Sequence, residues 1–450
     1  MQAWLSAGVM VVIATLLWLF EGPAINTGDW DRVTTSAGFV APPWEPMRTH
    51  YALETPVRFA NNSSMGVALS TLGWFTQRVG ETTLATAPIS ITLLLLLLAG
   101  SFFLARHVPR NYLVLTTLTL ILLCYSVYLK SFYGEAIILA LVPALCLGIK
   151  QLAHENRTLL FTLCAVAVVY AKQQMLFVAP VLILLLARNM WWYGATSLRL
   201  WTSLACIIFV CATTLVAHPE NSAPNQYNRY FNGVGWSLLH SADWPARRFE
   251  ERHPYFYEHQ QQLRDQLPAT LPEFNYLGTS YLPTASTILD AARDPEHAEA
   301  RREDAQALFD RLVSQGRPIP YATTLARHPG IVWQLIKNSF LTTVRSNYIV
   351  AYTRSTEQAN PVGGQTLAAA RTWVAGVFGW IFVAALLIAL LSHRSWFSAT
   401  TTAWMLLAPL AVVAGDGYFE FEKHMTAFFL FLPCALMAVR WQTPAQSGDR

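Results

Sequence analysis

Two aspartates and an arginine stand close together in the motif NTGDWDRV, near the start of the chain. The motif contains Asp29, Asp31 and Arg32 and follows an apolar segment. A carboxylate at this place can take a proton from an acceptor hydroxyl, and a neighbouring arginine can bind phosphate or keep the carboxylate ionised. A surface ion pair in an outer loop is the alternative interpretation.

A second motif, KSFYGE, separates two apolar segments and contains Tyr133 and Glu135 after Lys130. An ionisable residue at membrane depth is a candidate functional residue, whereas one at the membrane surface also serves as a snorkelling anchor. Both interpretations of Glu135 stay open at this point.

A third motif, VVYAKQQMLF, places Lys172 and Gln173 between two short apolar segments. A cation there is well placed to neutralise a lipid-linked phosphate. A hairpin turn capped by these two side chains explains the same pattern.

A fourth motif, GDGYFEFEKH, lies near the end of the chain and contains Asp416, Lys423 and His424. If Lys423 and His424 face a cavity, they can hold a phosphate. If they face the lipid headgroups, they are interfacial anchors.

The elements that position these motifs are predicted to be membrane helices. Hydrophobic residues make up 54% of the 450-residue chain and charged residues 13%, whereas an average soluble domain has about 25% charged residues. The predicted fold is mainly α: a polytopic helical membrane protein with about ten transmembrane helices. The predicted spans are residues 4–20, 86–105, 112–129, 135–149, 157–171, 174–187, 200–217, 371–391, 399–414 and 424–440.

The basic residues beside the spans predict the orientation of the protein. One set of loops has many arginines and lysines and almost no acids: Arg106, Arg110, Lys150, Arg157, Arg188, Arg199 and Arg394. Cytoplasmic loops carry such an excess, so both chain ends are predicted to be cytoplasmic. The four polar motifs then gather on the outer face.

Three parts of the chain follow from these spans. They are an N-terminal transmembrane module of residues 1–217 with a first outer loop at 21–85, an extracytoplasmic and mostly helical domain at 218–370, and C-terminal transmembrane helices at 371–450. Amphipathic patterns predict helices at 295–316 and 328–350, and short interfacial helices are expected within the first outer loop.

The positions of the cysteines and the absence of ligand-binding motifs bear on which disulfides, metals and cofactors are expected. All six cysteines fall in predicted spans, where they are expected to be packing residues and to form no disulfide framework. The sequence has no zinc-ligand spacing, phosphate-binding loop or dinucleotide motif. No cofactor is predicted, and a divalent cation held by Asp29, Asp31 and Asp416 is the alternative.

The motifs NTGDWDR, SFYGE, AKQQ, YNRYFNGV and GDGYFEFEKH, in this order and on one predicted side, resemble a family of bacterial polytopic membrane glycosyltransferases with the C-type fold. Members of that family take sugars from polyprenyl-phosphate carriers, as surface-glycan hexose transferases do. The resemblance extends from residue 26 to about residue 430 and implies an enzyme of the bacterial cytoplasmic membrane with its active site on the outer side.

The resemblance also implies roles for individual residues. Asp29 would be the base that activates the acceptor, with Asp31 as the second candidate. The carrier phosphate would be held by Arg32, Lys172, Lys423 and His424. The sugar or the base would be oriented by Tyr133, Glu135 and Asp416, and Gln173 would be a further substrate-binding residue. Direct displacement at the anomeric carbon would invert its configuration. The expected partners are the lipid-linked donor, a glycan, lipid or protein acceptor, and membrane lipids, with no nucleic acid.

Two alternatives belong to other functional classes. A lipid-linked glycan flippase or transporter would place charges deep within helices and on both sides of the membrane. A glycan polymerase or ligase would use lipid-linked glycans as both donor and acceptor, and the sequence does not separate it from a single-sugar transferase.

Overall fold

The structure is a computed structural model of the chain. It describes residues 2–20, 33–34, 37–40, 49–54, 56–57, 63–107, 112–194, 197–217, 329–345, 348, 364–392, 396–416 and 421–439. The described parts form two units. The first unit comprises residues 1–218, 348–406 and 426–450, and the second comprises residues 219–347 and 407–425.

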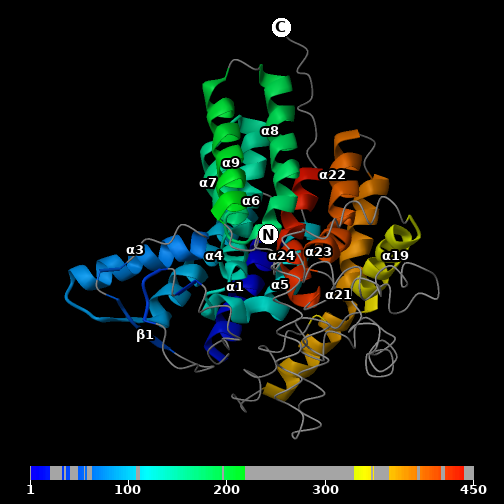
Figure 1. The fold of residues 1–450 in the computed structure, drawn as a ribbon. Helices are drawn as coiled ribbons and strands as arrows, with labels where there is room; N and C mark the ends of the chain where they lie inside the picture. Colours follow the sequence, from blue (N-terminus) through cyan, green and yellow to red (C-terminus); the bar gives the residue numbers. More distant parts are fainter. Residues whose placement is uncertain are drawn as a thin grey trace, which may run out of the picture. The chain divides into compact units, whose positions relative to one another are not determined.

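Helices make up most of the first unit (Figure 1). In chain order they are α1 (Gln2–Phe20), α3 (Ser64–Arg78), α4 (Thr86–His107), α5 (Tyr112–Tyr125), the 3-10 helix η1 (Ser126–Lys130), α6 (Gly134–Glu155), α7 (Leu159–Val169), the 3-10 helix η2 (Gln173–Val178), α8 (Ala179–Tyr193), α9 (Leu198–Ala217), α21 (Gly364–Ser392), α22 (Trp396–Leu406) and α24 (Phe421–Val439), the last of which begins in the second unit.

Helix α6 lies at the centre of this unit, packed against α4 and α7. Glycines allow both approaches. A Cβ atom on Gly100 of α4 would lie 3.0 Å from the backbone nitrogen of Ala144, and one on Gly148 of α6 would lie 2.8 Å from the Cα of Phe161 on α7. The backbones therefore pack at distances that a larger residue would prevent.

Replacing Gly148 with alanine is expected to destabilise the protein by about 1–3 kcal/mol, because the added methyl group forces α6 and α7 apart. The measurement is thermal unfolding of the purified protein in lipid nanodiscs. Gly376→Ala in α21 is the matched control, because a Cβ atom there meets nothing within 4 Å. An unchanged unfolding temperature for Gly148→Ala would contradict the expected close packing.

Contacts between helix ends show that the helix ends of the first unit lie in two groups. At one end, the indole nitrogen of Trp18 donates to Ser90 Oγ at 2.7 Å, and Lys130 Nζ lies 4.8 Å from the centre of the Trp18 ring. At the other end, Asn189 donates to Asn156 at 2.7 Å, and Lys150 donates to the carbonyl of His107. Successive helices thus alternate in direction, as a polytopic chain requires, and Lys150 lies at the end that is predicted to be cytoplasmic.

Residues 21–85, the predicted first outer loop, include a helix and a small two-stranded sheet. Strand β1 (His50–Ala52) pairs antiparallel with β2 (Thr83–Ala85), which leads directly into α4. Ser63 Oγ accepts a hydrogen bond from the backbone nitrogen of Gly66 at 3.1 Å and thereby caps α3. The backbone nitrogen of Ser64 donates to the carbonyl of Tyr170 at 3.0 Å, so α3 begins where α7 ends.

The C-terminal helices of the first unit pack on the N-terminal ones through aromatic side chains. The ring of Phe177 stacks on Trp404 of α22 at 5.0 Å, and the Trp404 indole donates to the Phe177 carbonyl at 2.6 Å. The ring of Phe378 on α21 lies 5.7 Å from that of Tyr125. These contacts join parts of the chain that are far apart in sequence.

The second unit has two described helices besides the start of α24. Helix α19 (Pro329–Arg345) packs on α23 (Ala408–Asp416). Helix α19 falls within the segment 328–350, where an amphipathic helix was predicted, and confirms it. The helix predicted at 295–316 lies outside the described residues.

The chain is a polytopic helical membrane protein, as predicted. In the described parts, six helical segments are long and apolar enough to cross a membrane: Thr86–His107, Gly134–Glu155, Gln173–Tyr193, Leu198–Val216, Ala369–Leu391 and Trp396–Val413. Shorter apolar helical segments are Val114–Lys130, Leu159–Val169 and His424–Ala438. The main difference from prediction lies at the helix ends. A run of apolar residues marks only the part of a helix that lies in the hydrocarbon core, whereas the helix itself extends beyond that core. Helix α6, for example, reaches Glu155 and ends at the left-handed Asn156.

Candidate functional site

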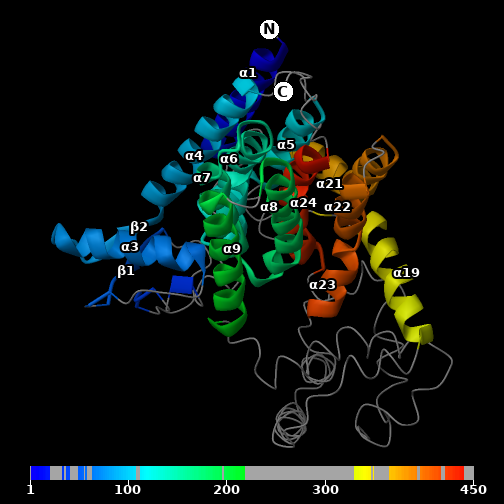
Figure 2. The ribbon, with the colours of Figure 1, turned by 90° about the horizontal axis from the view of Figure 1, so that it is seen from above.

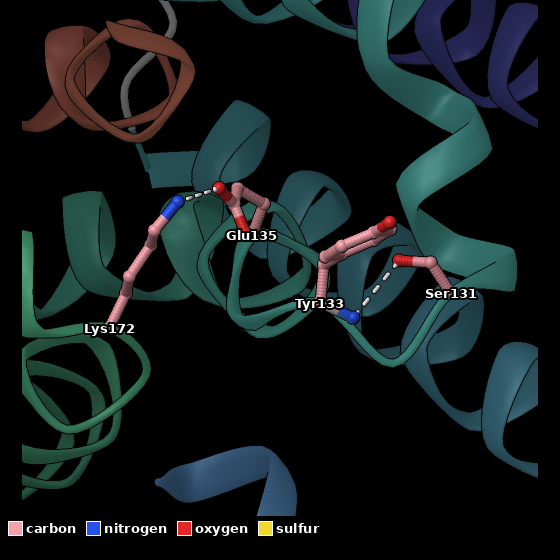
Figure 3. A network of polar contacts seen from close by, with 4 residues as sticks. All are labelled: Ser131, Tyr133, Glu135 and Lys172. Carbon is pink, nitrogen blue, oxygen red and sulfur yellow. Dashed lines mark hydrogen bonds and ion pairs between the residues drawn. The ribbon is translucent and has the colours of Figure 1, made fainter. Parts of the chain in front are cut away.

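A hydrogen-bonded turn carries the chain from η1 into α6 and positions the motif SFYGE. Ser131 Oγ donates to the carbonyl of Tyr128 at 2.7 Å and accepts from the backbone nitrogen of Tyr133 at 3.3 Å. Tyr133 is the N-cap residue of α6. The turn therefore sets where α6 begins and which way its first side chains point (Figure 3).

Gly134 brings this turn against the connection between α7 and η2. A Cβ atom at position 134 would lie 2.3 Å from the carbonyl oxygen of Ala171 and 3.0 Å from its carbonyl carbon. Such distances are impossible for a real side chain, so the two backbones meet only because residue 134 is glycine. The contact places the residue after Gly134 beside the residue after Ala171.

Those two residues form an ion pair. Lys172 Nζ donates to Glu135 Oε1 at 2.6 Å, as Figure 3 shows. The glutamate side chain is 2% exposed and the lysine side chain 21% exposed. A hydrogen bond between charged groups is stronger than a neutral one. Glu135 also lies in the first turn of α6, where the helix dipole favours a negative charge.

Aromatic rings pack against one another at the turn. The ring of Tyr133 lies 5.9 Å from Tyr128 in an edge-to-face contact. The ring of Phe132 lies 5.3 Å from that of Tyr51 on β1. Apolar surroundings strengthen the attraction between Glu135 and Lys172 and raise the cost of leaving either charge alone.

The pair excludes one of the interpretations that the sequence left open, that of Glu135 as a surface anchor. Glu135 is buried, so it is no snorkelling anchor at the lipid surface. Lys172 stands in the turn before η2, as the hairpin interpretation requires, but its side chain is directed to Glu135 and makes no capping hydrogen bond to η2. Its partial exposure leaves the ammonium group able to meet an anion.

The remaining predicted site residues fall in different parts of the chain. Gln173 is half-buried and begins η2, next to Lys172. His424 is half-buried in α24, in a stretch that belongs to the second unit. Asp416 ends α23 and Lys423 lies in α24, but their side chains are outside the described part, and so are Asp29, Asp31 and Arg32. Among the side chains that are described, no three His, Cys, Asp or Glu residues form a group able to hold a metal ion.

One buried charged residue of the membrane helices was not among the predicted ones. Arg371 on α21 is 1% exposed, and its Nε donates to the carbonyl of Leu123 at 2.8 Å while its Nη2 donates to Ser126 Oγ at 3.1 Å. These bonds hold the junction at which α5 becomes η1. The signal in the sequence was an arginine at the edge of a long apolar segment, because a charge in a membrane helix is rarely without a role.

The described cysteines behave as the sequence predicts. All six are free thiols, buried or half-buried among the helices. Cys146 of α6 and Cys434 of α24 approach each other with 3.6 Å between their sulfur atoms. They fill space at the packed centre of the first unit.

Comparisons with known proteins were made against protein families, curated proteins and solved structures. Neither the curated proteins nor the solved structures contain a match to the chain. The family model described as the YfdI N-terminal transmembrane domain matches residues 1–251, which is more than half of the 450 residues and includes the Glu135–Lys172 pair. The chain therefore belongs to the family of the YfdI N-terminal transmembrane domain.

Proposed function

We propose that this protein is an inverting membrane glycosyltransferase. It moves a sugar from a polyprenyl-phosphate carrier to an envelope or surface-glycan acceptor on the outer face of the bacterial cytoplasmic membrane. The observation that carries the proposal is the pair of Lys172 and Glu135, 2.6 Å apart at one end of a bundle of membrane helices. Membership of the YfdI family supports it, together with the order of the polar motifs.

Lys172 supplies the positive charge that a phosphate leaving group needs. When the bond between the anomeric carbon and the carrier oxygen breaks, negative charge grows on the phosphate, and a fixed cation stabilises that charge. Glu135 holds the Lys172 side chain in place through the 2.6 Å hydrogen bond between charged groups. Because Lys172 is 21% exposed, a phosphate can approach it without displacing Glu135.

The other roles are assigned from the resemblance. Asp29 accepts the proton of the acceptor hydroxyl, with Asp31 as the second candidate, and Arg32, Lys423 and His424 complete the phosphate site. Tyr133, Gln173 and Asp416 contact the sugar or orient the base. Attack and departure occur on opposite faces of the sugar, so the configuration inverts and no covalent enzyme intermediate forms. A charged leaving group and one base suffice for this step, so we assign no cofactor.

Replacing Asp29 with asparagine is expected to lower sugar transfer by about 10²–10⁴-fold, because the amide cannot accept the proton of the hydroxyl group. The measurement is transfer of radiolabelled sugar in membranes preloaded with polyprenyl-phosphate-hexose. Asp31→Asn is the matched control, and all proteins are compared at equal amounts of folded material.

The possible outcomes test two points separately: which residue is the base, and whether the protein transfers sugar at all. If Asp29→Asn transfers as fast as the unmodified protein, Asp29 is not the base and Asp31 takes its place. If the unmodified protein transfers no label from any of several donors, the glycosyltransferase proposal fails. The flippase alternative is then tested by movement of the labelled lipid across the membrane.

A further inference from the structure

Helix α3 presents an apolar face to the outside of the protein. The large side chains on this face are Val67 (41% exposed), Trp74 (37%) and Phe75 (57%), and Val79 (78%), the C-cap residue directly after the helix, continues it. The helix lies in the first outer loop and is part of the first unit. Exposed apolar groups of this size, gathered on one helix, mark a contact surface.

The opposite face of α3 is already occupied by the protein. Met65, Leu69 and Gly73 are buried there, and a Cβ atom on Gly73 would lie 3.4 Å from Leu53. Gln77 Nε2 donates to the carbonyl of Glu54 at 2.6 Å. The helix is therefore fixed in its rotation, and the apolar outer face is not the result of a loose attachment.

The direction of helix α3 relative to the membrane helices is the second observation. Helix α3 begins at the last turn of α7, where the Ser64 nitrogen donates to the Tyr170 carbonyl at 3.0 Å. From there it runs across the direction of α8 and α9, as Figures 1 and 2 both show. Since α8 and α9 belong to segments able to span the membrane, α3 runs along the plane of the bilayer.

We propose that the face formed by Val67, Trp74, Phe75 and Val79 rests in the interface of the lipid bilayer, so that α3 is a membrane-surface anchor. Tryptophan is enriched at this depth, and amphipathic helices bury their apolar face at the boundary of headgroups and acyl chains. Arg78 stands over the Trp74 ring at 4.9 Å, in the last turn of the helix. From that position its guanidinium group reaches lipid phosphates while its carbon stem stays on the apolar surface.

The anchor is independent of the proposed sugar transfer, because it rests on exposed side chains outside the Glu135–Lys172 pair. The two features meet in the chain at one place. Tyr170, to which the start of α3 is bonded, lies two residues before Lys172. An anchored α3 therefore holds that turn at a constant depth relative to the lipid headgroups.

Position-specific fluorescence quenching tests the anchor in the full-length protein, reconstituted in phosphatidylglycerol and phosphatidylethanolamine vesicles. The reporters are Phe75→Cys and Val79→Cys, each labelled with an environment-sensitive fluorophore, and Glu81→Cys in the exposed turn after α3 is the matched control. The six native cysteines are buried or half-buried, and the unmodified protein gives the background labelling. Lipids with spin labels near the headgroup, and iodide in the water, are the two quenchers.

We expect the spin-labelled lipids to remove most of the emission at positions 75 and 79 and iodide to remove most of it at position 81. Emission at 75 and 79 should also shift to shorter wavelength in vesicles. Iodide quenching of 75 and 79 to the extent seen at 81 overturns the proposal, because the face then lies in water. Protection of 75 and 79 from both quenchers also overturns it, because another protein surface then covers the face. Two reporters keep the test decisive if one variant fails to fold.

Discussion

Replacement of Glu135 with glutamine is expected to abolish sugar transfer and to lower the unfolding temperature. Glutamine still offers an oxygen to the Lys172 ammonium group but carries no negative charge, so the positive charge that lies 2.6 Å from Glu135 is no longer compensated. Breaking a buried ion pair by removing one partner costs about 3–5 kcal/mol, and the partial exposure of Lys172 puts the expected cost at the lower end of that range. Transfer of labelled hexose and thermal unfolding in nanodiscs are the two measurements.

The double variant Glu135→Gln/Lys172→Gln separates stability from catalysis. With both charges removed, no buried charge is left alone, so the double variant is expected to be more stable than Glu135→Gln. It should nevertheless transfer no sugar, because the cation for the leaving phosphate is missing. If the double variant recovers both stability and transfer, the pair is structural only, and the role proposed for Lys172 is wrong.

Replacement of Gly134 with alanine is expected to have the second largest effect. Its methyl carbon would lie 2.3 Å from the Ala171 carbonyl oxygen, so the turn before α6 and the turn before η2 must separate. Overpacking of this kind costs about 1–3 kcal/mol and sometimes more. The separation also lengthens the contact between Glu135 and Lys172, so transfer should fall more than stability alone explains.

Gly376→Ala serves as the control for this substitution as well, since a methyl group there meets nothing within 4 Å. An alanine in a helix interior is favoured over glycine by up to about 1 kcal/mol, so the control should unfold at the same or a slightly higher temperature. Retention of full transfer by Gly134→Ala at normal stability would show that the two turns tolerate separation. The close backbone contact would then have no part in forming the site.

The membrane helices could be predicted from the sequence because their signal is local. A sufficiently long run of apolar residues predicts a membrane-spanning segment without any information from the rest of the chain. The segments around 86–105 and 200–217 are indeed helices α4 and α9. Helix ends were less predictable, since polar residues such as Lys150 and Gln151 continue α6 by hydrogen bonding alone. Helix termination at Asn156 depends on backbone conformation, which hydropathy does not report.

The site could be predicted only as separate residues. Glu135 and Lys172 were both candidates, but they are 37 positions apart, and two explanations for each fitted the sequence equally well. Their pairing depends on Gly134, whose missing side chain lets two turns touch. Arg371 shows the same limit: its partners at Leu123 and Ser126 are in another helix pair and are known only once α21 is packed.

The rise of α6 has a consequence for the depth of the site in the membrane. At about 1.5 Å per residue, Glu135 and Lys150 are about 22 Å apart along the helix axis, whereas the hydrocarbon core of a typical bilayer is about 30 Å thick. Glu135 is buried inside the protein beside Lys172, so with Lys150 at one membrane surface the ion pair lies about 8 Å short of the opposite one. A phosphate group that reaches Lys172 must therefore enter below the level of the surrounding headgroups.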